Sequence, residues 1–345
     1  MTKLWVYESS KVMKKGICVA GNAIVDLLYP IENYPNEGEL TTIVADGIDK
    51  STGGALCNVI VDLAKLDPEL PLVAIGQIGN DENAELIKKT LNSYSNIDTS
   101  RIKEDGETSF TIVMSNQANK QRTFFQYRGA NAYISEDYFD WENLNVDLLH
   151  IGYILLLDAL DEEDEEYGTK MARLLANAKK HGIKTSIDIV SETGNRFKKI
   201  VPPALKYTDY CIINEIETQQ ATGILLRDGD TLVKDNMQTA LKALFDMGVS
   251  TWAIIHAPEG GYGMDQNREY VEIDSLDLPK GYIKGKVGAG DAFCSGVLYG
   301  AYNDMSLTEA IELGTGTASV SLSEEGATEG VRSFDEVMQF YNSMR

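Results

Sequence analysis

Six short apolar runs recur along the chain with helix-like patterns between them, and this alternation limits the possible folds more than any other feature. The runs are GICVAGNAIVDLLY, LPLVAIGQIG, VDLLHIGYILLL, IKTSIDIV, YTDYCIIN and STWAIIHA. Runs of this kind are typical of strands buried on both faces of a parallel sheet. The stretches between them predict helices over residues 55–66, 82–93, 163–181, 231–247 and 292–302. The sequence therefore predicts an α/β fold, a doubly wound, mostly parallel sheet flanked by helices.

Two segments interrupt this alternation. Residues 106–130 contain two β-rich runs around a turn-like stretch, and residues 32–52 alternate between apolar and polar side chains. They predict a small antiparallel sheet, the first of them as a hairpin. A few strands with one apolar face are unstable alone, so we expect this sheet to form a lid over a ligand site or to pair with a second subunit. Spacing alone also allows an edge extension of the main sheet.

Composition narrows the class of protein. The chain has 345 residues, of which 43% are hydrophobic and 24% charged, and this balance indicates a globular protein. Its length allows two or three domains, or one large α/β domain with an inserted accessory. Acidic residues outnumber basic ones by 53 to 31, giving a formal charge of −22, which disfavours nucleic acid and anionic membranes as partners. A nucleotide remains compatible, because backbone amides and bound Mg²⁺ can offset phosphate charge.

Cysteine spacing and the N-terminal sequence indicate the compartment. Cys18, Cys57, Cys211 and Cys294 lie far apart, with no CxxC pair and no histidine at zinc-finger spacing. This pattern predicts neither a disulfide framework nor structural zinc. We find no signal-peptide pattern and no apolar stretch long enough to span a bilayer. We therefore expect a cytoplasmic protein.

The segment VGAGDAFCSGVLYG carries the strongest sign of chemistry. Gly288, Ala289 and Gly290 stand just before a helix that is predicted to begin near Asp291. Successive backbone N–H groups at such a helix start suit a phosphate. A carboxylate in the first turn can accept the proton of an attacking hydroxyl while the amides stabilise the charge on the phosphoryl oxygens. From these four residues alone, a tight loop with an aspartate at a helix start, stabilised by the helix dipole, is the favoured interpretation.

Two further segments allow simple structural interpretations. The acidic run Asp161 to Glu166 is interpreted as a solvated helix start rather than a metal site, because carboxylates are favourable near the positive end of the helix dipole. Residues 333–345 predict a terminal helix, with Ser333 and Glu336 at capping-box spacing.

The order and spacing of three motifs resemble the ribokinase-like, or PfkB, family of carbohydrate and nucleoside kinases. STGGALCNVIVDLAKL and VGAGDAFCSGVLYG look like the two signature regions of the family, and IINEIET contains its NxxE motif. The resemblance covers residues 15–345 as one kinase domain, with a lid formed by about 32–52 and 106–130, and leaves 1–14 as an N-terminal extension. It implies transfer of phosphate from ATP to a primary hydroxyl of a small, ribose- or fructose-like sugar.

The resemblance also assigns a sugar-binding side. In the family, a carboxylate at the position of Asp26 binds sugar hydroxyls, and Gly53, Gly54 and Asn58 match a sugar-contacting loop and helix start. Arg128 resembles an arginine of fructokinase-like members that reaches the sugar or phosphoryl region. The alternatives are a turn followed by a helix cap for the loop residues, and a surface arginine on the lid for Arg128.

On the nucleotide side, Asn214 and Glu217 match the NxxE motif that helps to hold Mg²⁺ and its waters near the phosphates. Asn214 is also expected to cap the following helix. The resemblance places Asp188 near the phosphates and Gly261 in the nucleotide site. ATP and Mg²⁺ are therefore the implied cofactors.

The chain departs from the family pattern in two places. Many members carry DTxGAGD, whereas this chain has Gly285, Lys286 and Val287 before GAGD, so the aspartate that contributes to a monovalent-cation site is missing. Dependence on K⁺ is therefore doubtful. Pro258 stands where the family often has a glycine, so the nucleotide base is expected to sit differently. His256, nearby, is interpreted as a structural histidine.

Three other functional classes are disfavoured, and two alternatives to a sugar kinase stay open. The sequence lacks GxxxxGK[ST], a GxGxxG after the first strand, and GxSxG, which disfavours a P-loop enzyme, a dinucleotide-binding protein and an α/β-hydrolase. A nucleoside kinase would use the same machinery, and a catalytically retired kinase would bind sugar as a sensor. The apolar face expected on the lid motivates a further prediction, a homodimer in which two lids pair.

Overall fold

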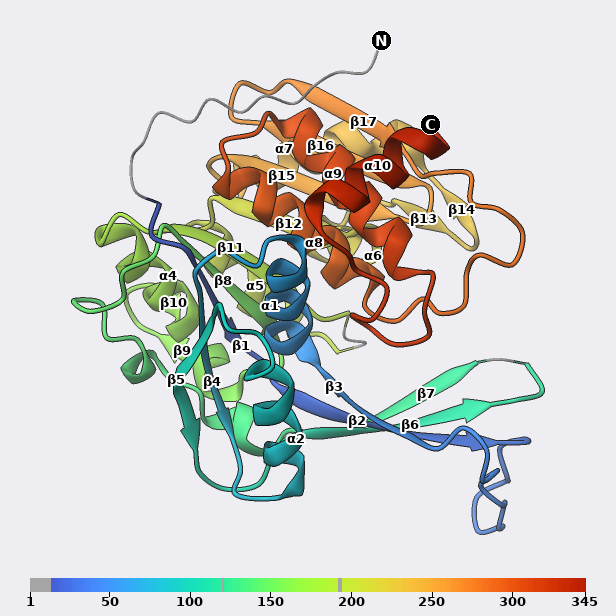
Figure 1. Ribbon diagram of the computed structural model, residues 1–345. Helices are drawn as coiled ribbons and strands as arrows, with labels where there is room; N and C mark the ends of the chain where they lie inside the picture. The colour runs from blue at the N-terminus through green and yellow to red at the C-terminus, as the bar shows by residue number, and fades with distance from the viewer. Residues whose placement is uncertain (1–13, 120, 192–193) are drawn as a thin grey trace.

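The computed structural model describes residues 14–119, 121–191 and 194–345. The main sheet has nine strands in the order β17-β16-β15-β12-β11-β8-β1-β4-β5 (Figure 1). The strands are β1 (Ile17–Gly21), β4 (Leu72–Ile78), β5 (Ile97–Glu104), β8 (Leu148–Ile154), β11 (Lys184–Ile189), β12 (Tyr210–Asn214), β15 (Trp252–Ala257), β16 (Gly260–Asp265) and β17 (Tyr270–Asp274). Only the β15–β16 and β16–β17 pairs are antiparallel. The predicted mostly parallel sheet is confirmed.

Helices cover both faces of this sheet, as the doubly wound prediction requires. One face packs against α1 (Gly54–Leu66), α2 (Glu82–Leu91), α8 (Ala289–Tyr302), α9 (Leu307–Ser321) and α10 (Phe334–Met344). The other face packs against α4 (Lys170–Lys180), α5 (Phe197–Leu205), α6 (Glu215–Thr222) and α7 (Met237–Asp246). The terminal helix α10 begins with the predicted capping box, in which the backbone N–H of Ser333 donates to the Glu336 carboxylate.

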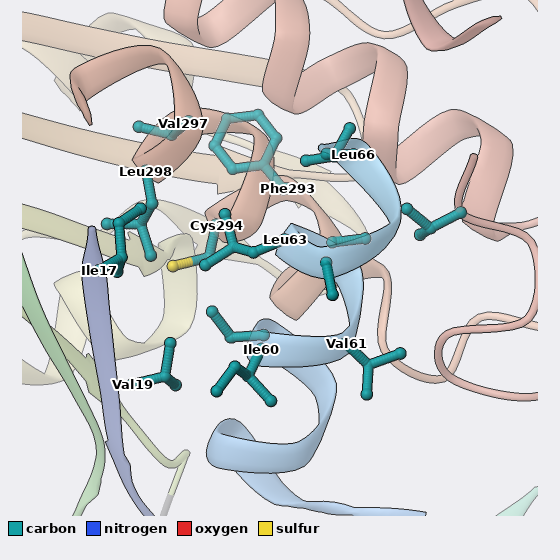
Figure 2. Packing of buried hydrophobic residues seen from close by; sticks show 14 of the residues in the cluster. Ile17, Val19, Ile60, Val61, Leu63, Leu66, Phe293, Cys294, Val297 and Leu298 are labelled. Carbon is teal, nitrogen blue, oxygen red and sulfur yellow. The ribbon is translucent and has the colours of Figure 1, made fainter. Parts of the chain in front are cut away.

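The strand order reverses beside β1, which pairs with β4 on one side and with β8 on the other. At the carboxyl end of this pair Gly21 stands opposite Gly152, and the N–H of Asn22 donates to the Gly152 carbonyl at 2.7 Å. Ligands of open α/β sheets bind beyond the strand ends at such a reversal. Figure 2 shows buried side chains of β1, α1 and α8 gathered in one cluster, and this packing brings the first turns of α1 and α8 to the same edge.

A second, small sheet has the order β3-β2-β6-β7 and extends away from the main body (Figure 1). Its strands are β2 (Ile24–Ile31), β3 (Asp49–Gly53), β6 (Phe110–Asn116) and β7 (Arg122–Tyr127). The predicted hairpin is present as β6 and β7, but β2 and β6 run parallel, so the sheet is mixed rather than purely antiparallel.

The first apolar run is divided between the two sheets, which the sequence did not predict. Gly21 ends β1 with φ +112°, and the space of its missing side chain is filled by the Gly152 carbonyl, so the backbone turns out of the main sheet there. The chain then enters β2 of the small sheet. A single strand over the whole run would be too long for one pass through the main sheet, and glycine is the residue that permits the turn.

The helix expected over 163–181 starts later, at Lys170. Asp164 accepts hydrogen bonds from the N–H groups of Glu166 and Tyr167, and this turn joins the short strands β9 (Glu163–Asp164) and β10 (Gly168–Thr169). The acidic run is therefore not a solvated helix start. Asp161, the first residue of the acidic run, is buried at the end of a four-residue helix, α3 (Asp158–Asp161), and accepts a hydrogen bond from the Leu155 N–H. In this segment, hydrogen bonds from local side chains favour a turn over the helix that residue propensity predicts.

The helix expected over residues 231–247 also starts later than expected. Residues 231–236, expected to begin a helix, form the short strand β14 (Thr231–Leu232) and a 3₁₀ turn, η3 (Lys234–Asn236), so α7 begins at Met237. The four cysteines are buried and free. Among the helices of the described residues, none combines the length and apolar character needed to cross a bilayer. Apart from Lys14, the expected N-terminal extension lies outside the described residues.

Candidate active site

Asp291 lies in the first turn of α8 and is held by two side chains from distant parts of the chain. Asn58, in α1, donates from Nδ2 to Oδ2 of Asp291 at 2.8 Å, and Tyr153, in β8, donates its hydroxyl proton to Oδ1 at 2.8 Å. Only 8% of Asp291 is exposed. Burial raises its pKa, while the two donated hydrogen bonds lower it. The carboxylate is thus fixed in direction at the edge of a cavity.

The start of α8 is shaped by small residues. Gly288, the N-cap, has φ +76°, and a side chain there would collide with the backbone of Ala327. It offers no side-chain cap, so the first N–H groups of the helix are not capped by that residue. Gly290 stands against the ring of His256, where a Cβ would lie 3.2 Å from Cε1. The structure therefore brings Gly288, Ala289 and Gly290 to the cavity edge beside Asp291, as the sequence predicts.

Two adjoining cavities meet at this helix start and share Asn214, His256 and Gly290. The first, of about 320 Å³, is lined by several residues with polar side chains, among them Tyr153, Asp188, Glu217 and Asp291. The second, of about 470 Å³, is lined largely by apolar groups, including Ala257, Pro258, Ile283, Phe293 and Leu322. A polar chamber joined to an apolar one suits a ligand with a charged part and a flat hydrophobic part.

Carboxylates dominate the polar cavity. Burial raises the pKa of Glu217 to about 7, and burial together with the carboxylates of Glu217 and Asp291 raises the pKa of Asp188 well above its usual value. Among the residues that the structure describes, no lysine or arginine lines this cavity. Bound cations would therefore favour the entry of an anionic ligand, in addition to the N–H groups at the start of α8.

Asn214 and Glu217 form a capping box at the start of α6. The Glu217 N–H donates to Oδ1 of Asn214 at 2.8 Å, the Asn214 N–H donates to the Glu217 carboxylate at 3.0 Å, and the Ser191 hydroxyl donates to it at 2.9 Å. The predicted cap is confirmed, and both residues line the polar cavity. Among the described residues no three His, Cys, Asp or Glu side chains are grouped closely enough to hold a metal directly. The carboxylate-rich, cation-poor lining fits Mg²⁺ held through its waters.

Asp26 approaches the same site from β2 of the small sheet. Burial raises its pKa to about 6; a hydrogen bond from Thr111 opposes this shift, and the charge of Asp291 adds to it. The adjacent glycines are explained by the packing of the protein itself. A side chain on Gly53 would collide with the Asp26 carboxylate, and one on Gly54, where φ is +85°, would collide with Asn22.

Asn22, directly after β1, is a candidate site residue that the sequence reasoning missed. It is 1% exposed, its Nδ2 has no hydrogen-bond partner, and its side chain lies beside Gly54. Oδ1 of Asn58 is likewise buried without a partner. Orphan polar atoms at a strand end indicate groups that a ligand or water completes. Asn22 was within the quoted GNAIVD motif, and its position directly after a buried strand was the available signal.

Tyr153 was missed for a different reason. It lies within a buried strand, in the run VDLLHIGYILLL, where an aromatic side chain is readily interpreted as core. Its contact with Asp291 joins residues 138 positions apart, and no local pattern reports such a contact. Burial raises the pKa of Tyr153 well above its usual value, so the phenol stays protonated and acts as a donor.

Arg128 and Gly261 lie outside this cluster. The Arg128 guanidinium donates to the Leu155 carbonyl at 2.8 Å and lies 3.8 Å from the Asp158 carboxylate, beyond the end of β8. Gly261 is buried in β16, and a side chain there would collide with Ile311 and Phe293. The adjacent Gly260 lines the apolar cavity instead.

His256, which is proposed to be structural, packs against Phe293 with the ring centroids 5.1 Å apart and the rings tilted, and burial lowers its pKa to about 4. Gly285 stands at the position where the family pattern has the aspartate of its monovalent-cation site. A Cβ on this residue would lie 2.8 and 2.7 Å from the carbonyl oxygens of Glu324 and Glu325, so an aspartate side chain could not be placed here unless this backbone moved. The residues present do not fit a cation site that needs a carboxylate there.

The geometry can now be compared with known proteins. A family model described as pfkB family carbohydrate kinase matches residues 14–333. The chain belongs to the PfkB family of carbohydrate kinases. The match spans both motif regions on which the resemblance rested, and so confirms it.

Curated relatives of this PfkB kinase are named as sugar kinases. A 5-dehydro-2-deoxygluconokinase from Listeria monocytogenes is 22% identical over 342 residues, which cover 94% of this chain and 95% of the relative. The probable fructokinase-7 of Arabidopsis thaliana is 24% identical over 332 residues, which cover 91% of each chain. The predicted class, a sugar kinase, is confirmed.

Solved structures confirm the fold of the PfkB kinase. The ribokinase of Arabidopsis thaliana, determined in complex with ribose and ATP, superposes with a TM-score of 0.77 at 20% identity, covering 95% of this chain and 99% of that one. The ribokinase of Thermotoga maritima gives a TM-score of 0.74 at 19% identity, with coverage of 95% and 99%. The ribokinase-like architecture with its additional small sheet is thus shown for nearly the whole chain.

Proposed function

We propose that this PfkB kinase transfers the terminal phosphoryl group of ATP to a primary hydroxyl of a small sugar. The observation that carries the proposal is the position of Asp291, at the start of α8 and at the edge of the polar cavity, with both carboxylate oxygens oriented by donors. A base beside a helix N-terminus can remove a proton where a phosphoryl group is bound.

In the proposed step, the sugar hydroxyl lies next to Asp291 and gives its proton to the carboxylate. The hydroxyl oxygen forms the new bond to the γ-phosphorus as the bond from that phosphorus to the bridging oxygen of ADP breaks. The N–H groups of residues 288–291 stabilise the negative charge on the phosphoryl oxygens during transfer. The products are ADP and a sugar phosphate, and the proton leaves later from Asp291.

The charge of ATP requires cations at the polar cavity. Asn214 and Glu217 would hold Mg²⁺ through water, with Asp188 as a further carboxylate at the same cavity. When bound, Mg²⁺ neutralises phosphate charge and orients the phosphate chain. The adjoining apolar cavity, with Pro258 and Phe293 in its walls, is assigned to the adenine base.

The sugar is assigned to the other side of Asp291, between β2 and α1. Asp26 can accept hydrogen bonds from two hydroxyls, while the unpartnered Nδ2 of Asn22 and Oδ1 of Asn58 supply one donor and one acceptor. Such a set suits a polyol of ribose or fructose size. Arg128 stands further out, where it would meet only the far end of a longer substrate.

The small sheet is proposed to close over the sugar as a lid and to pair with the lid of a second copy. Strand β7 is exposed along its whole length, with Phe124 62% and Phe125 55% exposed. Exposed aromatic residues on an edge strand are typical of a surface that becomes covered. Closure would exclude water and so favour transfer to sugar over hydrolysis of ATP.

ADP release over a panel of acceptors tests this proposal. The panel contains ribose, fructose, 5-dehydro-2-deoxygluconate and ribonucleosides, each with Mg·ATP in a coupled assay. We expect a small sugar or sugar acid to accelerate ADP release and a sugar phosphate to form. Acceleration by a ribonucleoside alone would assign the chain to nucleoside phosphorylation, and sugar binding without turnover would indicate a sensor; either result contradicts the proposal.

A further inference from the structure

The two cavities that meet at α8 contain very little positive charge. Three carboxylates, Asp188, Glu217 and Asp291, line the polar cavity, and Glu215 lines the apolar one. In the described part of the chain, Lys286 is the sole lysine or arginine among the residues that line either cavity. His256 is no substitute, because its lowered pKa leaves the ring uncharged at neutral pH.

The other basic side chains near the two cavities form ion pairs with carboxylates of the protein. Arg227 is bound by Glu215 at 2.6 Å and by Glu259 at 2.6 Å, and Lys284 is paired with Glu324 at 3.3 Å. Lys286 is exposed and makes no ion pair or hydrogen bond with the residues that the structure describes. A lysine at a cavity wall without a carboxylate partner is available to an anionic ligand.

The position of Lys286 fixes which part of a ligand it can reach. It stands two residues before Gly288, on the loop whose next residues, 288–290, line both cavities. Gly285, immediately before it, packs directly on the carbonyl oxygens of Glu324 and Glu325, which anchors the loop. Lys286 itself lines the apolar cavity, and Gly290, four residues on, lines both cavities, so the lysine stands beside the joint between them, where the phosphates next to a nucleoside would lie.

We propose that the Lys286 ammonium group binds the phosphate chain of the nucleotide and supplies at this joint a fixed positive charge in place of a bound monovalent ion. The inference rests on the proposed use of ATP. It accounts together for the absent carboxylate at Gly285 and for an otherwise unpaired lysine in a carboxylate-rich site. Because the charge is covalently attached, turnover does not depend on K⁺.

Calorimetry with Mg·AMP-PNP and with adenosine tests the phosphate contact without any turnover. Lys286→Met removes the charge and keeps most of the side-chain length, Lys286→Arg keeps the charge, and Lys284→Met is the matched control on the same loop. Loss of one charge-assisted contact weakens binding by about tenfold or more. We expect that loss for Mg·AMP-PNP with Lys286→Met, near-normal binding with Lys286→Arg and Lys284→Met, and unchanged adenosine binding in all variants.

Unchanged Mg·AMP-PNP binding by Lys286→Met would overturn the proposal, as would an equal loss of adenosine binding, which would place the lysine at the nucleoside. A second arm compares turnover in potassium with turnover in N-methylglucamine at equal ionic strength. Equal rates are expected, and saturable activation by K⁺ would contradict the substitution of lysine for a cation. A chain that binds nucleotide as predicted and phosphorylates no sugar would refute the proposed function and leave this inference standing.

Discussion

Tyr153 donates its hydroxyl proton to Oδ1 of Asp291 at 2.8 Å, and this contact joins the end of β8 to the first turn of α8. Because β8 is a strand of the main sheet, the contact ties the position of the proposed base to that sheet. It also favours the charged form of Asp291, against the burial that disfavours it. The tyrosine is therefore proposed to tune the base and to orient it.

Removing this phenol should shift the pH dependence of turnover. In Tyr153→Phe, the charged form of Asp291 loses a donor, so its pKa rises further and the acid limb of the kcat profile moves to higher pH. We expect kcat at pH 7 to fall about tenfold, with recovery as the pH is raised, as measured by kcat between pH 5.5 and 9. Tyr133→Phe, at a 69% exposed tyrosine, is the control and leaves the profile unchanged. A drop of equal size at every pH would contradict the tuning role.

Gly54 should be required for stability as well as for the shape of the site. In Gly54→Ala, the alanine must adopt a φ of +85°, and its Cβ would lie 2.6 Å from Oδ1 of Asn22. Steric overlap therefore adds to backbone strain. We expect a loss of about 2–4 kcal/mol in the free energy of unfolding, from urea denaturation. Gly182→Ala isolates the backbone part, because Gly182 has φ +76° with nothing within 4 Å, and should cost only about 1 kcal/mol. Equal losses in the two variants would show that the overlap with Asn22 is relieved without cost.

The carboxylates of the polar cavity should make the free enzyme less stable as the pH rises. Asp188 has a raised pKa in the folded state, so the folded chain binds its proton more tightly than the unfolded chain does. Stability therefore falls as the pH rises through the interval from the ordinary carboxyl pKa to the raised one. Asp188→Asn removes this titrating group, so it should raise the melting temperature at pH 7.5 and leave it nearly unchanged at pH 4. A variant less stable than the parent at pH 7.5 would show that the charged form is favoured in the fold.

The proposed lid pairing predicts a dimer that depends on exposed aromatic residues of β7. The unchanged chain should sediment as a dimer at micromolar concentration, and the double variant Phe124→Asp and Phe125→Asp should sediment as a monomer, because two charges in an apolar interface are costly. Leu225→Asp, at a 47% exposed leucine on the main body, is the control and should stay dimeric. Sedimentation of the unchanged chain as a monomer would contradict the proposed pairing of two lids.

Long buried strands and the helices between them were predictable because their patterns are local. The GAGD motif pointed to the start of α8, and the family resemblance pointed to Asp188 and Asn214, which lie at the carboxyl ends of β11 and β12. The run 16–29 failed as a single strand because one glycine redirects the backbone, and the sequence does not show which carbonyl will fill its missing side chain. The contact of Tyr153 with the active site could not be predicted from the sequence, because its partner lies 138 positions away.

The acidic run illustrates a second limit of sequence reasoning. Carboxylates near a helix start are usually solvated, yet Asp161 is buried and accepts a hydrogen bond from the Leu155 N–H, and Asp164 bends the chain into a turn. The parallel pairing of β2 with β6 was also not predictable, since strand direction depends on the path of the chain between the two segments. Such outcomes are set by particular hydrogen bonds and by the path of the chain, and not by propensity.

Turnover of Asp291→Asn, measured together with nucleotide binding, tests the central claim most directly. The asparagine keeps the size of the side chain and removes its ability to accept a proton, so kcat should fall by about 10³-fold. Mg·AMP-PNP should still bind to the variant, because the helix amides and the cavity walls remain in place. Near-full turnover by a folded Asp291→Asn enzyme would contradict the claim that this carboxylate deprotonates the sugar hydroxyl.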